Sequence, residues 1–213
     1  MNLFFLDYET NGLNPYYNDV IEVAIKQLDG DHHYQTMIKP DIISTRTRSG
    51  GINHYVSPRI TSLTGITNEQ IHKEGISTEL STANTVQYID EHSSNDESPI
   101  YIVSHNGTVF DFLFLNRLLK EHCLDHSNEL IKRFRFIDTC LLARLYLQDE
   151  RVNQPGLCKK YNITNDSTHR ALGDVNALEK LYRVMCEQYS IQEGQSKDYY
   201  LTHPDKLCDD LMA

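Results

Sequence analysis

Long hydrophobic runs are missing from this sequence. No apolar stretch approaches the roughly 18 residues needed to span a bilayer, and no basic segment precedes the first apolar run. Internal repeats and long low-complexity stretches are missing as well. We therefore expect no membrane partner and no signal peptide. The 213 residues, 39% hydrophobic and 23% charged, suit a domain with a full-sized core.

Paired cysteines are also missing. The five cysteines are scattered, odd in number and include no CxxC pair. This spacing indicates neither a zinc site nor a disulfide framework. We predict reduced thiols in an intracellular, reducing compartment, either cytoplasmic or nuclear. The positions are Cys123, Cys140, Cys158, Cys186 and Cys208.

Positive charge is scarce, with 20 Lys and Arg against 30 Asp and Glu and a net charge of −10. This balance argues against nucleic-acid binding that is driven by the overall charge of the protein. The objection weakens if many acids gather in one site where cations neutralise them. Three basic clusters are candidates for guiding a polyanion, although such runs are more often solvated surface. They are Arg46 with Arg48, Lys132-Arg133 with Arg135, and Lys159-Lys160.

The order of the expected elements predicts an α/β protein. Apolar and β-branched runs predict strands at 3–7, 20–28, 34–38, 100–103 and 134–137. The Asp29-Gly30-Asp31 turn makes the first three strands an antiparallel meander. Helices are expected from Pro58, at 79–92 after a Ser77 or Thr78 cap, and at 110–124, 139–147 and 170–189. Strands first, then strands alternating with helices, predict a mixed sheet flanked by helices.

The stretch FFLDYETNG at 4–12 ends an apolar run with two carboxylates, Asp7 and Glu9. Side chains two apart in a strand share a face, and strand ends are the usual location of sites in α/β sheets. Two carboxylates this close repel each other unless a divalent cation lies between them, and oxygen ligands favour magnesium or manganese over zinc. The alternative is a solvated turn, because Asn11-Gly12 is a strong turn signal.

Two later segments supply possible partners for this pair. In SHNGTVFDFLFL, Asp111 lies in the first turn of an apolar helix, where it also suits the helix dipole. In THRALGDVNAL, His169 lies five residues before Asp174, or about 140° away on a continuous helix. To reach one site, His169 should lie on a loop and Asp174 on the helix, with a bend at Gly173. The alternative for His169 is a surface histidine.

Together the three segments bring four carboxylates and one histidine to separate strand or helix ends. Two-metal phosphodiester hydrolysis uses this combination, because two cations about 3.5–4 Å apart clamp the attacking and leaving oxygens. Histidine is the side chain that ordinarily exchanges a proton near neutral pH, so it suits the role of general base.

In order and spacing, the segments resemble the motifs of the DEDDh (DnaQ-like) 3′→5′ exonuclease family. DYETNGL resembles the first motif, HNGTVFDF the second and HRALGDV the third, while LTGIT at 63–67 is similar to an element between the first two. The resemblance covers roughly residues 3 to 185. The second and third motifs look most like the TREX-type branch, and the polymerase proofreading branch is the alternative.

The resemblance implies an RNase H-like fold with a five-stranded mixed sheet. We predict a catalytic domain at 1–190, followed by a polar extension at 191–213 of unknown role. It implies two Mg²⁺ ions, for which Mn²⁺ can substitute. Asp7, Glu9 and Asp174 would hold the ion that binds the attacking water, and Asp7 with Asp111 the second ion. His169 would be the general base.

The resemblance also implies the contacts with substrate. Thr10 and Leu13 would touch the terminal nucleotide, while Glu9 would accept a hydrogen bond from its 3′-OH. Leu63 and Thr64 would contact the last bases, and Asn106 the backbone.

This sequence departs from the family pattern in three ways. Tyr8 stands where smaller or aliphatic residues are common, the polar loop at 41–57 is long, and the proline-rich insertion of the TREX branch is missing. The loop side chains that suit a single strand by charge and stacking are Arg46, Arg48, Asn53, His54 and Tyr55.

We therefore predict a metal-dependent exonuclease that releases nucleoside 5′-monophosphates from the 3′ ends of DNA, with single-stranded or frayed ends as substrate. An RNA-trimming enzyme of the same family is the closest alternative, because the chemistry does not distinguish the sugars. A non-catalytic nucleic-acid-binding module would need a missing ligand, and a phosphatase would need a phosphate loop. A homodimer or a polymerase partner is compatible with the sequence.

Overall fold

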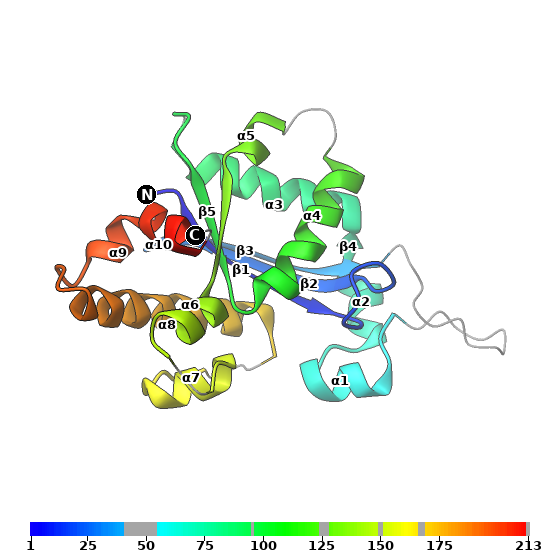
Figure 1. Cartoon of the computed structure of the whole chain (residues 1–213). Coiled ribbons are helices and arrows are strands. Elements are labelled where there is room, and N and C mark those ends of the chain that lie inside the picture. The colour runs from blue at the N-terminus through cyan, green and yellow to red at the C-terminus, as the bar shows by residue number, and fades with distance from the viewer. Residues whose placement is uncertain (41–54, 95, 124–127, 149–150, 166–168, 212–213) are drawn as a thin grey trace.

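A six-stranded mixed sheet lies at the centre of the computed structural model, which describes residues 1–40, 55–94, 96–123, 128–148, 151–165 and 169–211. The strand order is β4-β3-β2-β1-β5-β6 (Figure 1). The strands are β1 (Leu3–Thr10), β2 (Val20–Gln27), β3 (His33–Lys39), β4 (Ile76–Ser77), β5 (Ile100–Ser104) and β6 (Phe134–Asp138). The expected count of five strands was wrong by one: β4 has only two residues, too few for an alternating pattern to predict it.

The predicted antiparallel meander is confirmed. β1 pairs antiparallel with β2, and β2 pairs antiparallel with β3. The turn between β2 and β3 is closed by the Gly30 amide, which donates to the Gln27 carbonyl, while Asp29 takes a left-handed conformation at φ 59°. β5 runs parallel to β1, and β6 runs parallel to β5. The carboxyl ends of these three strands therefore meet at one edge of the sheet.

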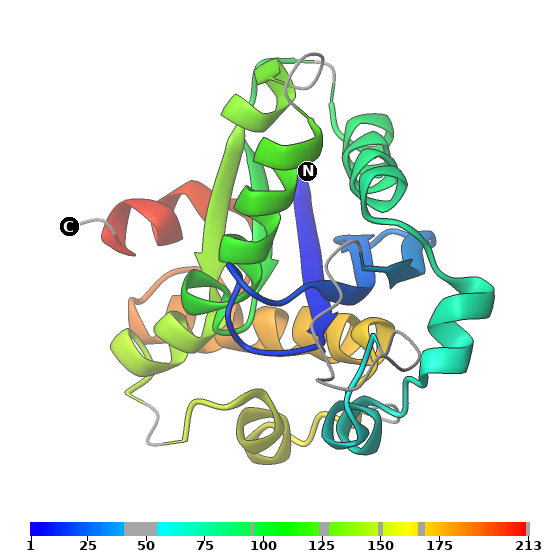
Figure 2. The ribbon, with the colours of Figure 1, turned by 90° about the vertical axis from the view of Figure 1, so that its right-hand side faces the viewer.

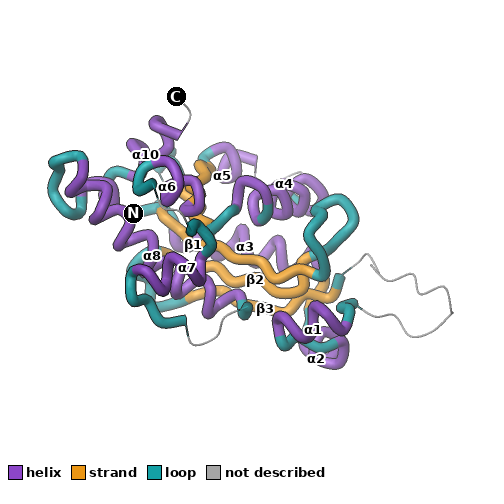
Figure 3. The backbone as a smooth tube through the Cα atoms, turned by 60° about the horizontal axis from the view of Figure 1, so that its bottom comes forward, coloured by secondary structure: helices purple, strands orange, loops and turns teal. Residues whose placement is uncertain are grey.

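Helices cover both faces of the sheet (Figure 1). One layer contains α3 and α4, and the other contains α8 with α6 and α7; α2 packs beside β3 at the sheet's margin (Figure 3). The α-helices up to α5 are α1 (Pro58–Thr64), α2 (Asn68–Glu74), α3 (Thr78–His92), α4 (Asp111–His122) and α5 (Asn128–Lys132). The later α-helices are α6 (Thr139–Leu145), α7 (Gln154–Lys160), α8 (Ala171–Gln192), α9 (Tyr199–Thr202) and α10 (Pro204–Leu211), and a 3₁₀ turn, η1 (Gly107–Val109), precedes α4.

Alternation along β1 decides which layer each of its side chains meets. Leu3 and Phe5 pack into the core shared with α8, whereas Phe4 and Leu6 pack into the core shared with α3 and α4. Since side chains two apart share a face, Asp7 continues the Leu3–Phe5 row towards α8. The first strand therefore points its carboxylates at the layer that contains Asp174.

Part of the segment after residue 190 joins this core. Tyr200 and Leu207 belong to the same buried cluster as α8. The ring of Tyr189 lies 4.5 Å from that of Tyr146 and 4.5 Å from that of Tyr200, so aromatic contacts attach α9 to the end of α8. Among the described residues, none of the helices combines the length and the apolar character that crossing a membrane requires.

Candidate active site

The last residues of β1 carry Asp7 and Glu9 into a region of concentrated negative charge. Glu9 is 9% exposed. Burial, and then repulsion by Asp174, Glu22 and Asp111, raises the pKa of Glu9 to about 8, while Arg170 opposes this shift. The pKa of Asp7 is raised well above its usual range by burial and by the carboxylates of Asp111, Asp174 and Glu9. Such raised values indicate a site that lacks enough positive charge of its own.

Asp111 is the first residue of α4 and is almost completely buried. The Ser104 hydroxyl donates to its Oδ2 at 2.6 Å, and the Tyr8 amide donates to its Oδ1 at 3.1 Å. Burial raises the pKa of Asp111 to about 7, although these two hydrogen bonds favour the charged form. The bond from Tyr8 attaches Asp111 directly to the strand that carries Asp7 and Glu9.

Another buried carboxylate, Asp138, shapes the turn that leads into α4. It lies at the end of β6 and accepts hydrogen bonds from the amides of Asn106 at 2.9 Å, Thr108 at 3.0 Å and Cys140 at 2.9 Å. Asn106 has a left-handed φ of 61°. Sequence reasoning missed Asp138, although an acid between a predicted strand and a predicted helix was the available signal.

His169 lies on the loop before α8, and Asp174 lies in the first turn of that helix, as predicted. The bend is not at Gly173, which is inside the helix; it is at His169 itself, whose φ is 62°. The His169 amide donates to Asp174 Oδ2 at 2.9 Å, and the Asn165 side-chain amide donates to Oδ1 at 2.6 Å. Burial raises the pKa of Asp174, and both hydrogen bonds oppose that shift.

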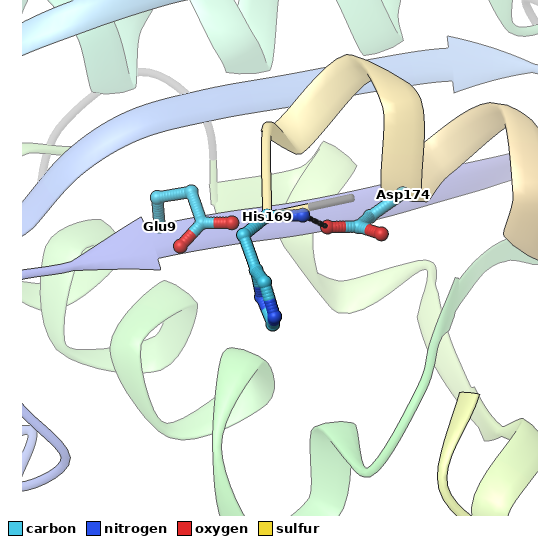
Figure 4. Close-up of side chains that lie close together, drawn as sticks. All are labelled: Glu9, His169 and Asp174. Carbon is cyan, nitrogen blue, oxygen red and sulfur yellow. Dashed lines mark hydrogen bonds between the residues drawn. The ribbon is translucent and has the colours of Figure 1, made fainter. Parts of the chain in front are cut away.

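The structure brings Glu9, His169 and Asp174 together. Each offers one potential ligand atom, and these atoms lie within 4.8 Å of one another. Figure 4 shows the two carboxylates on either side of the His169 backbone, one from β1 and the other from α8. Carboxylate oxygens at this spacing, with the charges of Asp7 and Asp111 close enough to raise pKa values, fit a divalent cation.

Glu22 and Arg170 connect the sheet to the loop that carries His169. Glu22 lies opposite Glu9 in the β1–β2 pairing and is 1% exposed. Arg170 Nη2 donates to Glu22 Oε1 at 2.7 Å, and the Ala171 amide donates to Oε2 at 3.0 Å. Sequence reasoning missed both residues, because nothing in their spacing predicts a contact 148 positions apart.

The predicted substrate contacts differ in accessibility. Leu13 is 83% exposed and Leu63 is 52% exposed, and Asn106 is also exposed. Thr10 is buried, and its hydroxyl donates to the Gly12 carbonyl at 2.7 Å. Thr64 is buried too, so Leu63 is the member of the predicted pair that faces solvent.

Part of the predicted basic clusters lies in the described residues. There, the basic side chains mostly contact other groups of the protein. The Arg133 guanidinium donates to the Ser98 carbonyl at 2.9 Å, and Arg135 donates to the Lys132 carbonyl at 3.0 Å. Lys160 lies over the ring of Tyr161. Outside the described residues lie Arg46, Arg48, Asn53 and His54.

Comparison with known proteins shows the family to which the chain belongs. Residues 4–182 match the family model RNase_T, described as Exonuclease, so the chain belongs to this DnaQ-like exonuclease family of nuclease hydrolases. It is 29% identical over 181 residues to the DNA polymerase III PolC-type of Thermotoga petrophila, and 26% identical over 189 residues to that of Streptococcus pneumoniae. These alignments cover 83% and 88% of this chain but only 11% of each polymerase.

Solved structures support the fold. Exonuclease I aligns over 94% of this chain and 43% of its own, with a TM-score of 0.70 and 18% identity. Escherichia coli exonuclease I in complex with a dT13 oligonucleotide gives the same TM-score, and a zinc-bound form of its complex with single-stranded DNA gives 0.68. The predicted RNase H-like fold is thereby confirmed.

Proposed function

We propose that this chain is a 3′→5′ exonuclease that hydrolyses phosphodiester bonds at the 3′ ends of DNA and releases nucleoside 5′-monophosphates. Single-stranded or frayed ends are the proposed substrate, and residues 1–190 the catalytic domain. The observation that carries the proposal is the convergence of Glu9, His169 and Asp174 beside the half-buried Asp7 and the buried Asp111. All five positions of the family's motifs are filled, which disfavours a non-catalytic binding module.

The donor set suits two divalent cations, with Mg²⁺ as the proposed species and Mn²⁺ as its substitute, because hard oxygen ligands favour these ions. Asp7, Glu9 and Asp174 would hold one ion, and Asp7 with Asp111 the other. Bound cations would lower the pKa of the attacking water and offset charge on the attacking and leaving oxygens.

The side chains of the chain itself account for the remaining steps. His169 would take the proton of the attacking water, since its loop places it beside Glu9 and Asp174. Glu9 would accept a hydrogen bond from the terminal 3′-OH, which would select a free 3′ end. Thr10 and Leu13 would contact the terminal nucleotide, Leu63 with Thr64 the last bases, and Asn106 the backbone.

The choice of DNA has support from the names of related proteins. The sequence relatives are PolC-type DNA polymerases, and one fold neighbour was solved with a dT13 oligonucleotide. Because this chain spans about 11% of those polymerases, we also propose that it works beside a polymerase, as a partner or as a domain, with a homodimer as the alternative assembly.

Digestion of matched 5′-labelled single-stranded DNA and RNA oligonucleotides with Mg²⁺ tests the proposal. We expect a descending ladder on DNA and none with the Asp7→Ala variant. A ladder on RNA alone would keep the mechanism and change the substrate. No ladder on either strand with Mg²⁺ or Mn²⁺ would contradict the proposed activity.

A further inference from the structure

The loop between β1 and β2 displays aromatic rings to solvent beside the candidate active site. Tyr16 is 79% exposed and Tyr17 is 74% exposed, and Leu13 on the same loop is 83% exposed. Residues 11–18, NGLNPYYN, contain no charged side chain, in a chain whose net charge is −10. The loop thus combines large exposed rings with neutrality, which is unusual for a solvated surface segment.

Local hydrogen bonds hold this loop in one conformation. The Tyr17 and Asn18 amides donate to the Asn14 carbonyl at 3.1 and 2.8 Å, and the Tyr16 amide donates to Asn14 Oδ1 at 2.9 Å. Asn18 Oδ1 accepts from the Asn14 amide at 3.1 Å. A Cβ on Gly12 would collide with the Asn18 side chain, so a larger residue there would displace Asn18 and its bond to the Asn14 amide.

Further bonds join the loop to the active-site elements. Arg117 on α4 donates through Nη1 to the Pro15 carbonyl at 2.7 Å and to the Asn18 carbonyl at 2.9 Å. Its Nη2 donates to Asp19 Oδ1 at 3.0 Å. Figure 2 shows this dark-blue loop crossing beside the green helix α4. Since a helix rises 1.5 Å per residue, Arg117 lies about 9 Å along α4 from Asp111.

Exposed rings on a preformed loop at this position are suited to stacking. Every base has a π face, so aromatic rings hold single strands without reading sequence. Residues 11–18 present no carboxylate to repel phosphates, and the carboxylate of Asp19 is buried and bonded to Arg117. This matters in a chain of net negative charge. A preformed loop also loses little conformational entropy when a strand binds.

We propose that Tyr16 and Tyr17 form a stacking platform for bases of a single strand, on the 5′ side of the nucleotide being removed. The proposal rests on the proposed exonuclease function and adds its strand-binding surface. The platform binds the strand by stacking its rings on bases, because the net negative charge of the protein disfavours contacts with phosphates. It also attaches through Arg117 to the helix that begins with Asp111, so strand binding and the reacting end share one rigid unit.

Two substrates of different length test the platform. The first is an oligonucleotide of about eight nucleotides, long enough to reach the loop. The second is the p-nitrophenyl ester of thymidine 5′-monophosphate, which occupies the active site alone. For the double variant Tyr16→Ala/Tyr17→Ala we expect KM for the oligonucleotide to rise about tenfold or more. Hydrolysis of the ester should stay within about twofold of wild type, because no platform residue touches it.

The matched control is Tyr16→Phe/Tyr17→Phe, which keeps both rings and should bind like wild type. Fluorescence anisotropy of the labelled oligonucleotide, as DNA and as RNA, measures binding independently of cleavage. Equal affinity of the alanine and wild-type proteins for both strands would overturn the platform, even if the ester is cleaved. Failure of wild type to cleave either substrate, with tyrosine-dependent binding retained, would instead contradict the proposed activity alone.

Discussion

Arg170 and Glu22 form a hydrogen-bonded ion pair between the loop that carries His169 and the second strand of the sheet. Arg170 Nη2 lies 2.7 Å from Glu22 Oε1, and its Nε lies 3.2 Å from Oε2. Glu22 is buried, whereas the Arg170 side chain is 36% exposed. The pair therefore anchors the start of α8 to the strand that pairs with the Glu9 segment.

The charge of Arg170 also acts on the site, because it lowers the pKa of Glu9 against larger opposing effects. Replacing it in Arg170→Met should raise the pKa of Glu9 and move the acid limb of the pH–rate profile to higher pH. On that limb, activity falls roughly tenfold when the pKa of the required carboxylate rises by about one. The measurement is kcat/KM against pH with Arg170→Lys as control. An unchanged profile in Arg170→Met would show that the arginine only shapes the loop.

We expect the Asp7 carboxylate to be essential for activity but to lower the stability of the metal-free protein. Its carboxylate is repelled by Asp111, Asp174 and Glu9, so Asp7→Ala relieves repulsion while it removes a proposed ligand for both cations. We expect cleavage to fall below detection and the melting temperature of the metal-free protein to stay level or rise. Thermal denaturation in EDTA beside a ladder assay measures both. Near-wild-type cleavage would remove Asp7 from the site.

The stability of the metal-free protein should fall as pH rises. Folding raises the pKa of Glu9 from 4.5 to about 8 and that of Asp111 from 3.8 to about 7, so the folded state binds more protons than the unfolded state between these values. The free energy of unfolding therefore declines from about pH 4 to pH 8. Urea denaturation across this range checks the slope, and Glu9→Gln should flatten part of it.

Added Mg²⁺ should reverse the decline, because cations bind the ionised carboxylates and stabilise the folded state by mass action. The stabilisation should be larger at pH 8 than at pH 5. Equal stabilisation at both pH values would mean that the ion binds away from these acids.

His169 combines a backbone role with its proposed chemical role, and the two can be separated. Its φ of 62° favours Asn or Gly over Ala, and its amide donates to Asp174. His169→Asn should keep the loop while it lowers kcat by roughly 10²–10⁴-fold, the usual worth of general-base assistance. Oligonucleotide affinity should change far less than kcat. Retained activity with an unchanged pH–rate profile in this variant would exclude His169 as the base.

Local patterns along the chain determined the class of fold and the candidate ligands. Apolar and β-branched runs predicted β1, β2 and β3. Asp7 and Glu9 follow such a run, and side chains two apart in a strand share a face. The position of Asp111 at the start of α4 and of Asp174 in the first turn of α8 followed from helical periodicity. These patterns depend on residues that are close together in the sequence, so one sequence is enough to detect them.

Only the tertiary structure decided how these residues meet and what holds them there. The pairing of Glu22 with Arg170 and the support of residues 106–108 by Asp138 join segments far apart in sequence. The bend at His169 and the clamp of Arg117 on the Tyr16–Tyr17 loop likewise depend on packing between layers. Hydrogen bonds and ion pairs of this kind produce no repeating pattern in the sequence, because the fold, and not the neighbouring residues, determines which groups meet.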